Sequence, residues 1–263
     1  MDISIVIVNY QSRAKTAACL QSILASNLAG IEYEIIVVDN SEKDDIGSEM
    51  RQDFPSVRFI HSRKNIGMGA GNNLGFREAA GKFFLVLNSD TLVDPDAIRI
   101  LFETLRDRDD IGIAGPKLLN PNGSLQYSCF RFPKAYTPIL RRTFLGKFTP
   151  KHLARYLMTD FDHTENQDVD WMLGSCLMIR ASFFQSVGGF DERFFMYFED
   201  TDLCRRAWRN GYRVVYIPSA TVVHDHARGS AREHWYIAPF TSRLAREHIC
   251  SWMRYLWKWR PRR

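Results

Sequence analysis

The chain has 263 residues, of which 45% are hydrophobic, 13% aromatic and 25% charged, a composition that excludes a disordered or fibrous protein. Its net charge of +5 is placed unevenly. Residues 241–263 hold seven Lys and Arg against one Glu, or +6, which leaves −1 for the rest. The five cysteines are widely spaced and include no C-x-x-C pair, so they predict reduced core thiols and no zinc or redox site.

No apolar run is long enough to span a bilayer, and the N-terminus, MDISIVIVNY, lacks the basic start and cleavage site of a signal peptide. We therefore expect a cytoplasmic protein without a transmembrane helix.

The first 110 residues alternate short apolar runs with amphipathic segments. The runs are apolar on both faces, as strands inside a parallel sheet are. Ser12 is placed to cap one helix, and Asp94-Pro95 to start another as N-cap and first helical residue. The pattern predicts a doubly wound α/β sheet with helices on both faces. The expected strands are residues 3–8, 34–38, 57–60 and 83–87.

The second half is less regular. Residues 169–180 and 212–218 predict strands, and residues around 182–188 and 201–210 predict helices. The segment 120–168, with its Pro, Asn and scattered basic residues, gives no clear element.

Two aspartates follow predicted strands. Asp39 ends EIIVVD and Asp90 ends FFLVLNSD. In an open parallel sheet, ligands bind beyond the carboxyl ends of the strands, so we expect adjacent strands to present both carboxylates to one crevice. The alternative role of each is to form a turn.

A segment rich in glycine and asparagine, KNIGMGAGNNLGF, occupies residues 64–76. We expect a loop that brings backbone N–H groups near an anion and opens a helix over residues 76–80. The G-x-G-x-x-G pattern fails here, because its third position is Asn72 or Leu74, and the turn after the first strand has no glycine. A nicotinamide or flavin dehydrogenase is therefore disfavoured.

A third cluster, GGFDERFFMYFEDTDLCRRAW, covers residues 188–208. Burial of Glu199 and Asp200 against its aromatic run should raise a carboxyl pKa toward that of a usable general base. Helix capping by Asp200 or Thr201 is the alternative, and the two roles are compatible. Further on, His224 and His226 follow a strand, a pair that by itself is more often structural than a metal site.

In their order and spacing, V-D-N, N-x-G, N-S-D, W-x-x-G and F-E-D-x-D resemble the inverting family 2 glycosyltransferases with the GT-A fold. The later motifs resemble those of the rhamnosyltransferases of bacterial surface-polysaccharide assembly. The resemblance covers residues 1–230 and implies a Rossmann-like, mostly parallel sheet, with a nucleotide-sugar half at 1–110 and an acceptor half at 111–230.

The family's roles carry over as implications of this resemblance. Asp90 would ligate Mg²⁺ or Mn²⁺ on the donor diphosphate, with His224 as the second protein ligand, and Asp200 would be the general base. One departure affects the metal: Asn88 stands where the family has the first Asp of D-x-D. The residues implied in substrate binding are Asp39 at the base or ribose, Asn65, Gly67 and Asn73 around it, Trp171 and Glu199 at the sugars, and Arg228.

These residue types suit the chemistry. A hard divalent cation takes oxygen ligands and neutralises a leaving diphosphate, so no second carboxylic acid is needed to protonate the leaving group. A single base and one in-line displacement then invert the anomeric configuration.

The tail, residues 231–263, combines basic residues with four tryptophans and suits an anionic membrane surface. The alternative is a helix packed on the domain with a solvated basic side. No nucleic-acid-binding module accompanies it, so nucleic acid is not an expected partner. The tryptophans are Trp235, Trp252, Trp257 and Trp259, and the residues expected on one apolar helix face are Leu244, Ile249, Met253, Leu256 and Trp257.

The sequence thus predicts a metal-dependent inverting transferase that moves a sugar, best L-rhamnose from dTDP-L-rhamnose, onto a lipid-linked or oligosaccharide acceptor. It would act in cell-surface polysaccharide synthesis, as a peripheral protein at the cytoplasmic face of the membrane. Two alternatives stay open: polyprenyl phosphate itself as the acceptor, and a non-catalytic subunit that binds sugar nucleotides or glycans, which the incomplete N-S-D suggests.

Overall fold

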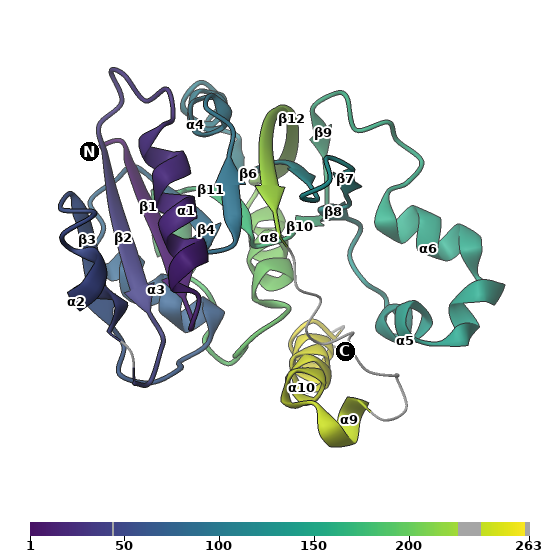
Figure 1. Cartoon of the computed structure of the whole chain (residues 1–263). Helices are drawn as coiled ribbons and strands as arrows, with labels where there is room; N and C mark the ends of the chain where they lie inside the picture. The colour runs from purple at the N-terminus through teal and green to yellow at the C-terminus, as the bar shows by residue number, and fades with distance from the viewer. Residues whose placement is uncertain (44, 226–237, 261–263) are drawn as a thin grey trace.

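The computed structural model describes residues 1–43, 45–225 and 238–260 (Figure 1). Its main sheet has the order β3-β2-β1-β4-β11-β6-β12-β5, with β7 beside β6 and β9 beside β12. A separate small sheet pairs β8 (Cys129–Phe130) with β10 (Trp171–Met172). The main strands are β1 (Ile3–Asn9), β2 (Tyr33–Asp39), β3 (Val57–His61), β4 (Phe83–Asn88), β5 (Thr91–Val93), β6 (Ile111–Leu119), β7 (Leu125–Gln126), β9 (Gln167–Asp168), β11 (Cys176–Arg180) and β12 (Arg213–His224).

The four predicted N-terminal strands are confirmed and run parallel. The chain steps outward from β1 in both directions, to β2 and to β4, so the topological switch point lies between β1 and β4. Beyond β4, the antiparallel strand β11 joins β6 and β12 to the same sheet, which therefore continues across residue 110.

Two strand expectations are wrong in detail, and one strand is not predicted. The strand expected over 169–180 is two strands in different sheets, because the chain turns away at 173–175. β6 was not predicted, since Gly112, Gly115 and Pro116 interrupt its apolar pattern. β12 runs on to His224, past a register shift between Ile217 and Thr221.

Helices cover both faces of the sheet, as predicted, because alternate strand residues serve two cores. Ile5 and Ile7 of β1 pack with α1 and α4, whereas Val6 and Val8 pack with α3, α7 and α8. Cys19, Cys129, Cys176 and Cys204 are buried free thiols, as expected. The helices are α1 (Arg13–Leu24), α2 (Ile46–Met50), α3 (Met68–Arg77), α4 (Ala97–Arg106), α5 (Thr137–Arg142), α6 (Pro150–Leu157), α7 (Ala181–Ser186), α8 (Glu199–Arg209), α9 (Ala238–Thr241) and α10 (Arg243–Lys258), with a 3-10 helix at η1 (Phe144–Phe148).

The loop expected at residues 64–76 is mostly helix, since α3 begins at Met68. Its glycines let α3 approach the sheet closely. A Cβ on Gly75 would lie 2.6 Å from Val6 Cγ1, and one on Gly71 would lie 3.0 Å from Val8 Cγ1. Gly71 and Gly75 are therefore required for close packing of α3 on the sheet, and they lie in a helix and not in an anion-binding loop.

Both expected helix caps are also different. Ser12 precedes α1, but its hydroxyl donates to the Tyr10 carbonyl, and Asn9 Oδ1 accepts from the Ser12 N–H instead. The helix expected at Asp94-Pro95 starts two residues later, at Ala97, because the Asp94 carbonyl closes a turn with the Ala97 N–H.

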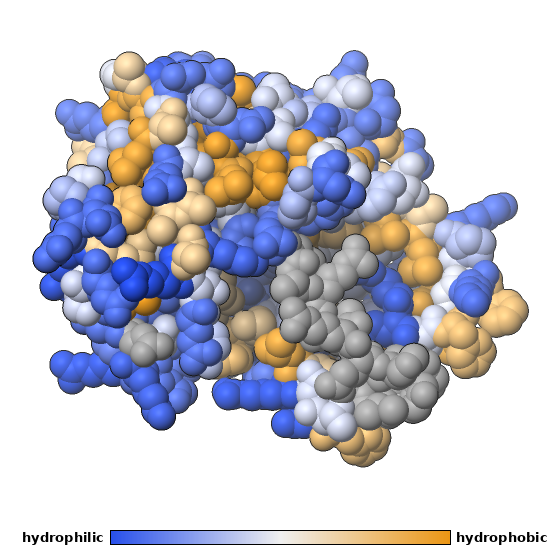
Figure 2. Space-filling view, in the orientation of Figure 1, coloured by the Kyte–Doolittle hydropathy of each residue, from blue (hydrophilic) through white to orange (hydrophobic). Residues whose placement is uncertain are grey.

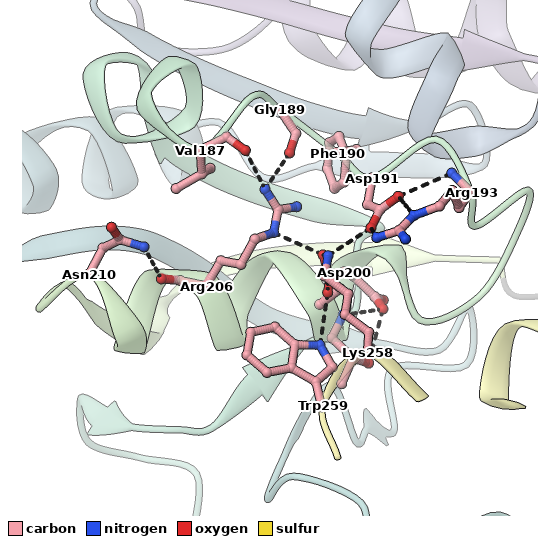
Figure 3. A network of polar contacts seen from close by, with 12 residues as sticks. Val187, Gly189, Phe190, Asp191, Arg193, Asp200, Arg206, Asn210, Lys258 and Trp259 are labelled. Atoms are coloured by element: carbon pink, nitrogen blue, oxygen red, sulfur yellow. Dashed lines mark hydrogen bonds and ion pairs between the residues drawn. The ribbon is translucent and has the colours of Figure 1, made fainter. Parts of the chain in front are cut away.

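The C-terminal helix α10 packs on α8 through a buried polar network (Figure 3). Asp202 of α8 is fully buried and accepts from Arg206 Nε at 2.8 Å, Lys258 Nζ at 2.9 Å and Trp259 Nε1 at 2.9 Å. The expected apolar face is wrong, since Met253 and Trp257 are 54% and 61% exposed. Residues 255 and 259 point inward instead, so α10 is part of the folded domain.

Candidate active site

A cavity of about 530 Å³, a size typical of small-ligand sites, opens at the carboxyl ends of the central strands. Tyr10 follows β1, Asn88 ends β4 and His224 ends β12. Glu199 and Asp200, the first residues of α8, complete the wall from the other side. The cavity thus lies at the switch point, where an open α/β sheet binds its ligand.

Asp90 and His224 meet at one edge of this cavity. His224 Nε2 lies 3.3 Å from Asp90 Oδ1, because β5 and β12 pair antiparallel and bring Thr91 opposite His224. Burial raises the pKa of Asp90, but the hydrogen bond and charge of His224, together with the charge of Lys15, outweigh it and lower the pKa overall. The carboxylate is therefore ionised and turned toward an imidazole nitrogen.

Gln126 of β7 fixes the orientation of that imidazole. Its Nε2 donates to two acceptors, the His224 carbonyl at 3.2 Å and Asn120 Oδ1 at 2.9 Å. Its Oε1 must therefore face His224 Nδ1, which lies 2.7 Å away. Nδ1 consequently donates a hydrogen bond to Gln126 Oε1, which turns Nε2 toward Asp90. A hydrogen bond to the other ring nitrogen orients a metal-binding histidine in this way.

Asp90, His224 and Asn88 fit a divalent cation whose remaining ligands come from a bound substrate. The described residues contain no cluster of three or more His, Cys, Asp or Glu able to bind a metal by themselves. Asp90, in the turn between β4 and β5, and His224, at the end of β12, could supply two ligands. Asn88 adds a buried Oδ1 with no hydrogen-bond partner among the described residues, next to the same cavity. Mg²⁺ or Mn²⁺ is commonly bound in this way, by one or two protein ligands plus phosphate oxygens.

Asp200 is held rigidly opposite. Its Oδ2 accepts from the Gly174 N–H at 3.0 Å, and its Oδ1 accepts from the Thr201 N–H at 2.6 Å. Burial raises the pKa of Asp200, and these N–H donors partly offset that effect. The turn at 173–175 that splits the predicted strand is thus the segment that orients this carboxylate.

Glu199, beside it, has a different environment. Its Oε2 is buried without a hydrogen-bond partner among the described residues. Burial and the charge of Asp200 raise the pKa of Glu199 to about 8. Near neutral pH Glu199 is therefore a neutral acid, whereas the N–H donors of Gly174 and Thr201 favour the charged form of Asp200 beside it. Neighbouring carboxyls in such different environments are typical of acid–base sites.

The backbone before this pair is strained. Tyr197 and Phe198 have φ of 70° and 68°, in the left-handed region that side chains rarely adopt. The Met68 N–H and the Ser251 hydroxyl hold this segment at the carbonyls of Phe195 and Met196. α3 and α10 therefore both help to fix the start of α8.

Other residues expected in the site lie around it. Asn65 lines the cavity, and its Oδ1 accepts from the Gly67 N–H. Gly67 is required by close packing, since a Cβ there would lie 2.2 Å from the Phe195 carbonyl oxygen. Asn73 donates to the Phe190 carbonyl and accepts from its N–H, which holds the loop before α8.

Asp39 and Trp171 do not line the cavity. β1 separates β2 from β4, so the expectation that Asp39 and Asp90 share one crevice on adjacent strands is wrong. Asp39 is 1% exposed and accepts from Asn9 Nδ2 and the Ile46 N–H. Trp171 stacks on Phe130 with ring centroids 4.5 Å apart. Arg228 and His226 lie outside the described residues.

Sequence reasoning missed two residues here. Gln126 is 98 positions from His224, and no local signal marks it as its partner. Arg243, at the start of α10, lines the cavity and adds a cation. The excess of basic residues in the tail was the available signal for Arg243, but we interpreted that charge as membrane-directed.

These features define an enzyme of the GT-A class. They are the doubly wound sheet, the cavity at its switch point, and the Asp90–His224 pair facing the carboxyls of Glu199 and Asp200. Residues 1–236 match the model of "Glycosyltransferase like family 2", and the chain belongs to this family. It is a nucleotide-sugar-dependent glycosyltransferase.

Two curated relatives have named activities. The N-acetylglucosaminyl-diphospho-decaprenol L-rhamnosyltransferase of Mycobacterium tuberculosis is 32% identical over 231 residues, covering 81% of this chain and 74% of that protein. The rhamnosyltransferase WbbL of Escherichia coli is 28% identical, covering 85% and 82%.

Two solved structures share the fold. GalNAc-T7 with UDP, GalNAc and Mn²⁺ matches with a TM-score of 0.64 and 17% identity, covering 85% of this chain and 44% of that one. The Pyrobaculum calidifontis mannosyltransferase with GDP-Man and Mn²⁺ matches with a TM-score of 0.63 and 15% identity, covering 97% and 64%. The chain thus spans less than two thirds of either solved chain.

Proposed function

We propose that this enzyme transfers L-rhamnose from dTDP-L-rhamnose, with inversion and with Mg²⁺ or Mn²⁺, to a lipid-linked or oligosaccharide acceptor in cell-surface polysaccharide synthesis. The observation that carries the chemistry is one cavity with Asp90 and His224 on one wall and Asp200 on the other. The rhamnosyl donor is supported by the names of the two relatives, one of which acts on a diphospho-decaprenol substrate.

Asp90 and His224 would hold the cation, with Gln126 keeping the imidazole lone pair toward it. When bound, the cation neutralises the charge that develops on the leaving diphosphate. Arg243, which lines the same cavity, adds a second positive charge for the phosphates.

Asp200 would take the proton from the attacking acceptor hydroxyl. The N–H groups of Gly174 and Thr201 keep its carboxylate from rotating. Glu199, neutral near pH 7, would donate a hydrogen bond to a sugar hydroxyl. Because the diphosphate leaves as a bound anion, no protein acid has to protonate it, and a single displacement inverts the anomeric centre.

The remaining substrate assignments are indirect. We propose that residues 1–110 serve mainly the nucleotide sugar and residues 111–230 the acceptor. Asp39 would hold the N–H groups of Ser41 and Ile46 beside the base or ribose, and Asn65 would contact the donor directly. Gly67 and Asn73 would shape that pocket, and Trp171 would support the 173–175 turn.

We also propose a peripheral location at the cytoplasmic face of the membrane. Within the described residues, no helix is both long and apolar enough to cross a bilayer. A lipid-linked acceptor would therefore have to be reached from the membrane surface.

A thermal-shift panel of sugar nucleotides, with and without Mn²⁺, tests the donor, because a ligand that binds the folded state raises its Tm. We expect the largest shift with dTDP-L-rhamnose plus Mn²⁺. Turnover with N-acetylglucosaminyl-diphospho-polyprenol, followed by NMR of the new linkage, tests the reaction. A product that retains the donor's anomeric configuration would overturn the mechanism. Binding of sugar nucleotides without transfer to any acceptor would favour a non-catalytic binding subunit.

A further inference from the structure

A second basic segment lies outside the C-terminal tail. Residues 131–159 hold seven Lys and Arg and no Asp or Glu. With +7 here and +6 in residues 241–263, the remainder of the +5 chain carries 5 − 13, or −8. The net charge of −1 for residues 1–240 therefore conceals a strongly basic segment. We call residues 137–157, which form α5, η1 and α6, the helical arm.

The inner face of the helical arm is attached to the domain. Tyr156 is buried against Phe130, with ring centroids 5.6 Å apart, and its carbonyl accepts from the Arg131 N–H. The guanidinium of Arg141 lies over both rings. The arm therefore has a fixed orientation, and its outer face points away from the fold.

That outer face is apolar and basic. Phe144 is 59% exposed and Phe148 is 77% exposed. Lys147 and Lys151, on the same stretch, are exposed and form no ion pair within the described part of the chain. Figure 2 shows apolar side chains, in light orange, over the α5–α6 region at the lower right, beside hydrophilic blue ones.

The C-terminal helices continue this surface. Phe240 of α9 is 83% exposed, and Trp257 of α10 is 61% exposed. Figure 1 shows α5 next to α10, and this proximity lets the charges of Arg142 and Arg141 act on His248 of α10. Burial and these charges lower the pKa of His248 to about 3. The start of α10 lines the cavity, so this surface lies beside the cavity's wall.

We propose that the outer face of the helical arm, together with Phe240, docks on an anionic phospholipid bilayer and so brings the cavity to a lipid-linked acceptor. The proposal rests on the proposed function for the nature of the acceptor. Exposed phenyl rings with unpaired lysines match an interface where rings enter the headgroup region and cations meet anionic lipids. We infer that the bilayer, and not a folded protein, covers this surface. The arm carries five Lys and Arg and no Asp or Glu, so it has no acidic side chain to pair with basic residues of a protein partner. Its charge is complementary to an anionic lipid surface.

The test is sedimentation of the full chain with phosphatidylglycerol vesicles and with phosphatidylcholine vesicles at low salt. Wild type should bind the anionic vesicles and be released by added salt. Lys147→Gln with Lys151→Gln should weaken the partition coefficient about 30-fold, since each cation is worth about 1 kcal/mol near an anionic surface. Phe144→Ser with Phe148→Ser should weaken binding at low salt, because the rings no longer enter the headgroup region.

The matched control is Leu24→Ser with Lys82→Gln, which removes an exposed apolar and an exposed basic residue elsewhere. It should bind like wild type, and circular dichroism should show all variants folded. The proposal is overturned if wild type does not sediment with anionic vesicles, or if both arm variants bind as it does. Transfer to a short-chain, water-soluble acceptor is the separate readout. If transfer persists in arm variants that have lost vesicle binding, docking and chemistry are distinct. If the wild type shows no transfer, that result counts against the proposed function and not against the docking surface.

Discussion

Glu199 offers the sharpest test of how the two adjacent carboxyls at the start of α8 are tuned. Replacing Glu199 by Gln keeps the size of the neutral acid and removes its titration. In the wild type, the folded-state pKa is about 8 against a reference of 4.5. The folded protein therefore holds a proton that the unfolded chain releases between these two values, and the free energy of unfolding falls as pH rises through that window.

The size of the effect follows from the shift. At 1.36 kcal/mol per pKa unit, the full shift corresponds to about 5 kcal/mol. Glu199 is half-buried at a cavity that admits water, so solvent screening reduces this upper bound, and we expect about 2 kcal/mol. Glu199→Gln should lack this loss of stability between pH 5 and pH 9.

Urea unfolding at several pH values measures it, with the exposed Glu165→Gln variant as the control. Activity should follow the same logic. Wild-type kcat/KM should fall above about pH 8, where Glu199 gains a charge next to Asp200. In Glu199→Gln, kcat/KM should not fall in this range. If Glu199→Gln and wild type lose stability equally between pH 5 and pH 9, Glu199 is already ionised and the assignment of acid and base fails.

The other predictions concern the remaining groups of the site and its support. Asp200→Asn should lower kcat by roughly 10²- to 10⁴-fold and leave donor affinity by calorimetry nearly intact; wild-type turnover would remove Asp200 from the mechanism. Asp90→Ala should abolish Mn²⁺-dependent donor binding, and full wild-type activity in excess EDTA would contradict a metal role. Gln126→Leu should weaken Mn²⁺ affinity about 10- to 100-fold by EPR of free Mn²⁺, whereas Gln126→Glu, which keeps an acceptor, should not. Lys258→Met should cost about 2 kcal/mol of unfolding free energy, since Asp202 loses a charged donor while buried, and a change under about 0.5 kcal/mol would show that Arg206 and Trp259 suffice.

The sequence alone determined the N-terminal sheet and predicted which polar residues gather at its edge. Strands such as residues 3–8 are apolar on both faces, and only a strand covered by helices on both sides buries such a run. Asp90 and His224 could be chosen because they lie at or just beyond a strand end, and Glu199 and Asp200 because they open a helix. Such positions gather at one edge of a doubly wound sheet.

Only the tertiary structure decided the contacts between distant segments. Gln126 orients His224 across 98 residues, and Lys258 reaches Asp202 across 56, distances at which no local pattern carries information. For the same reason the glycines of α3 were misinterpreted as an anion-binding loop: their function is to leave space for Val6 and Val8 of a strand some sixty residues earlier. Local propensity fixes which elements form, whereas long-range packing fixes which faces they bury and which side chains they bring together.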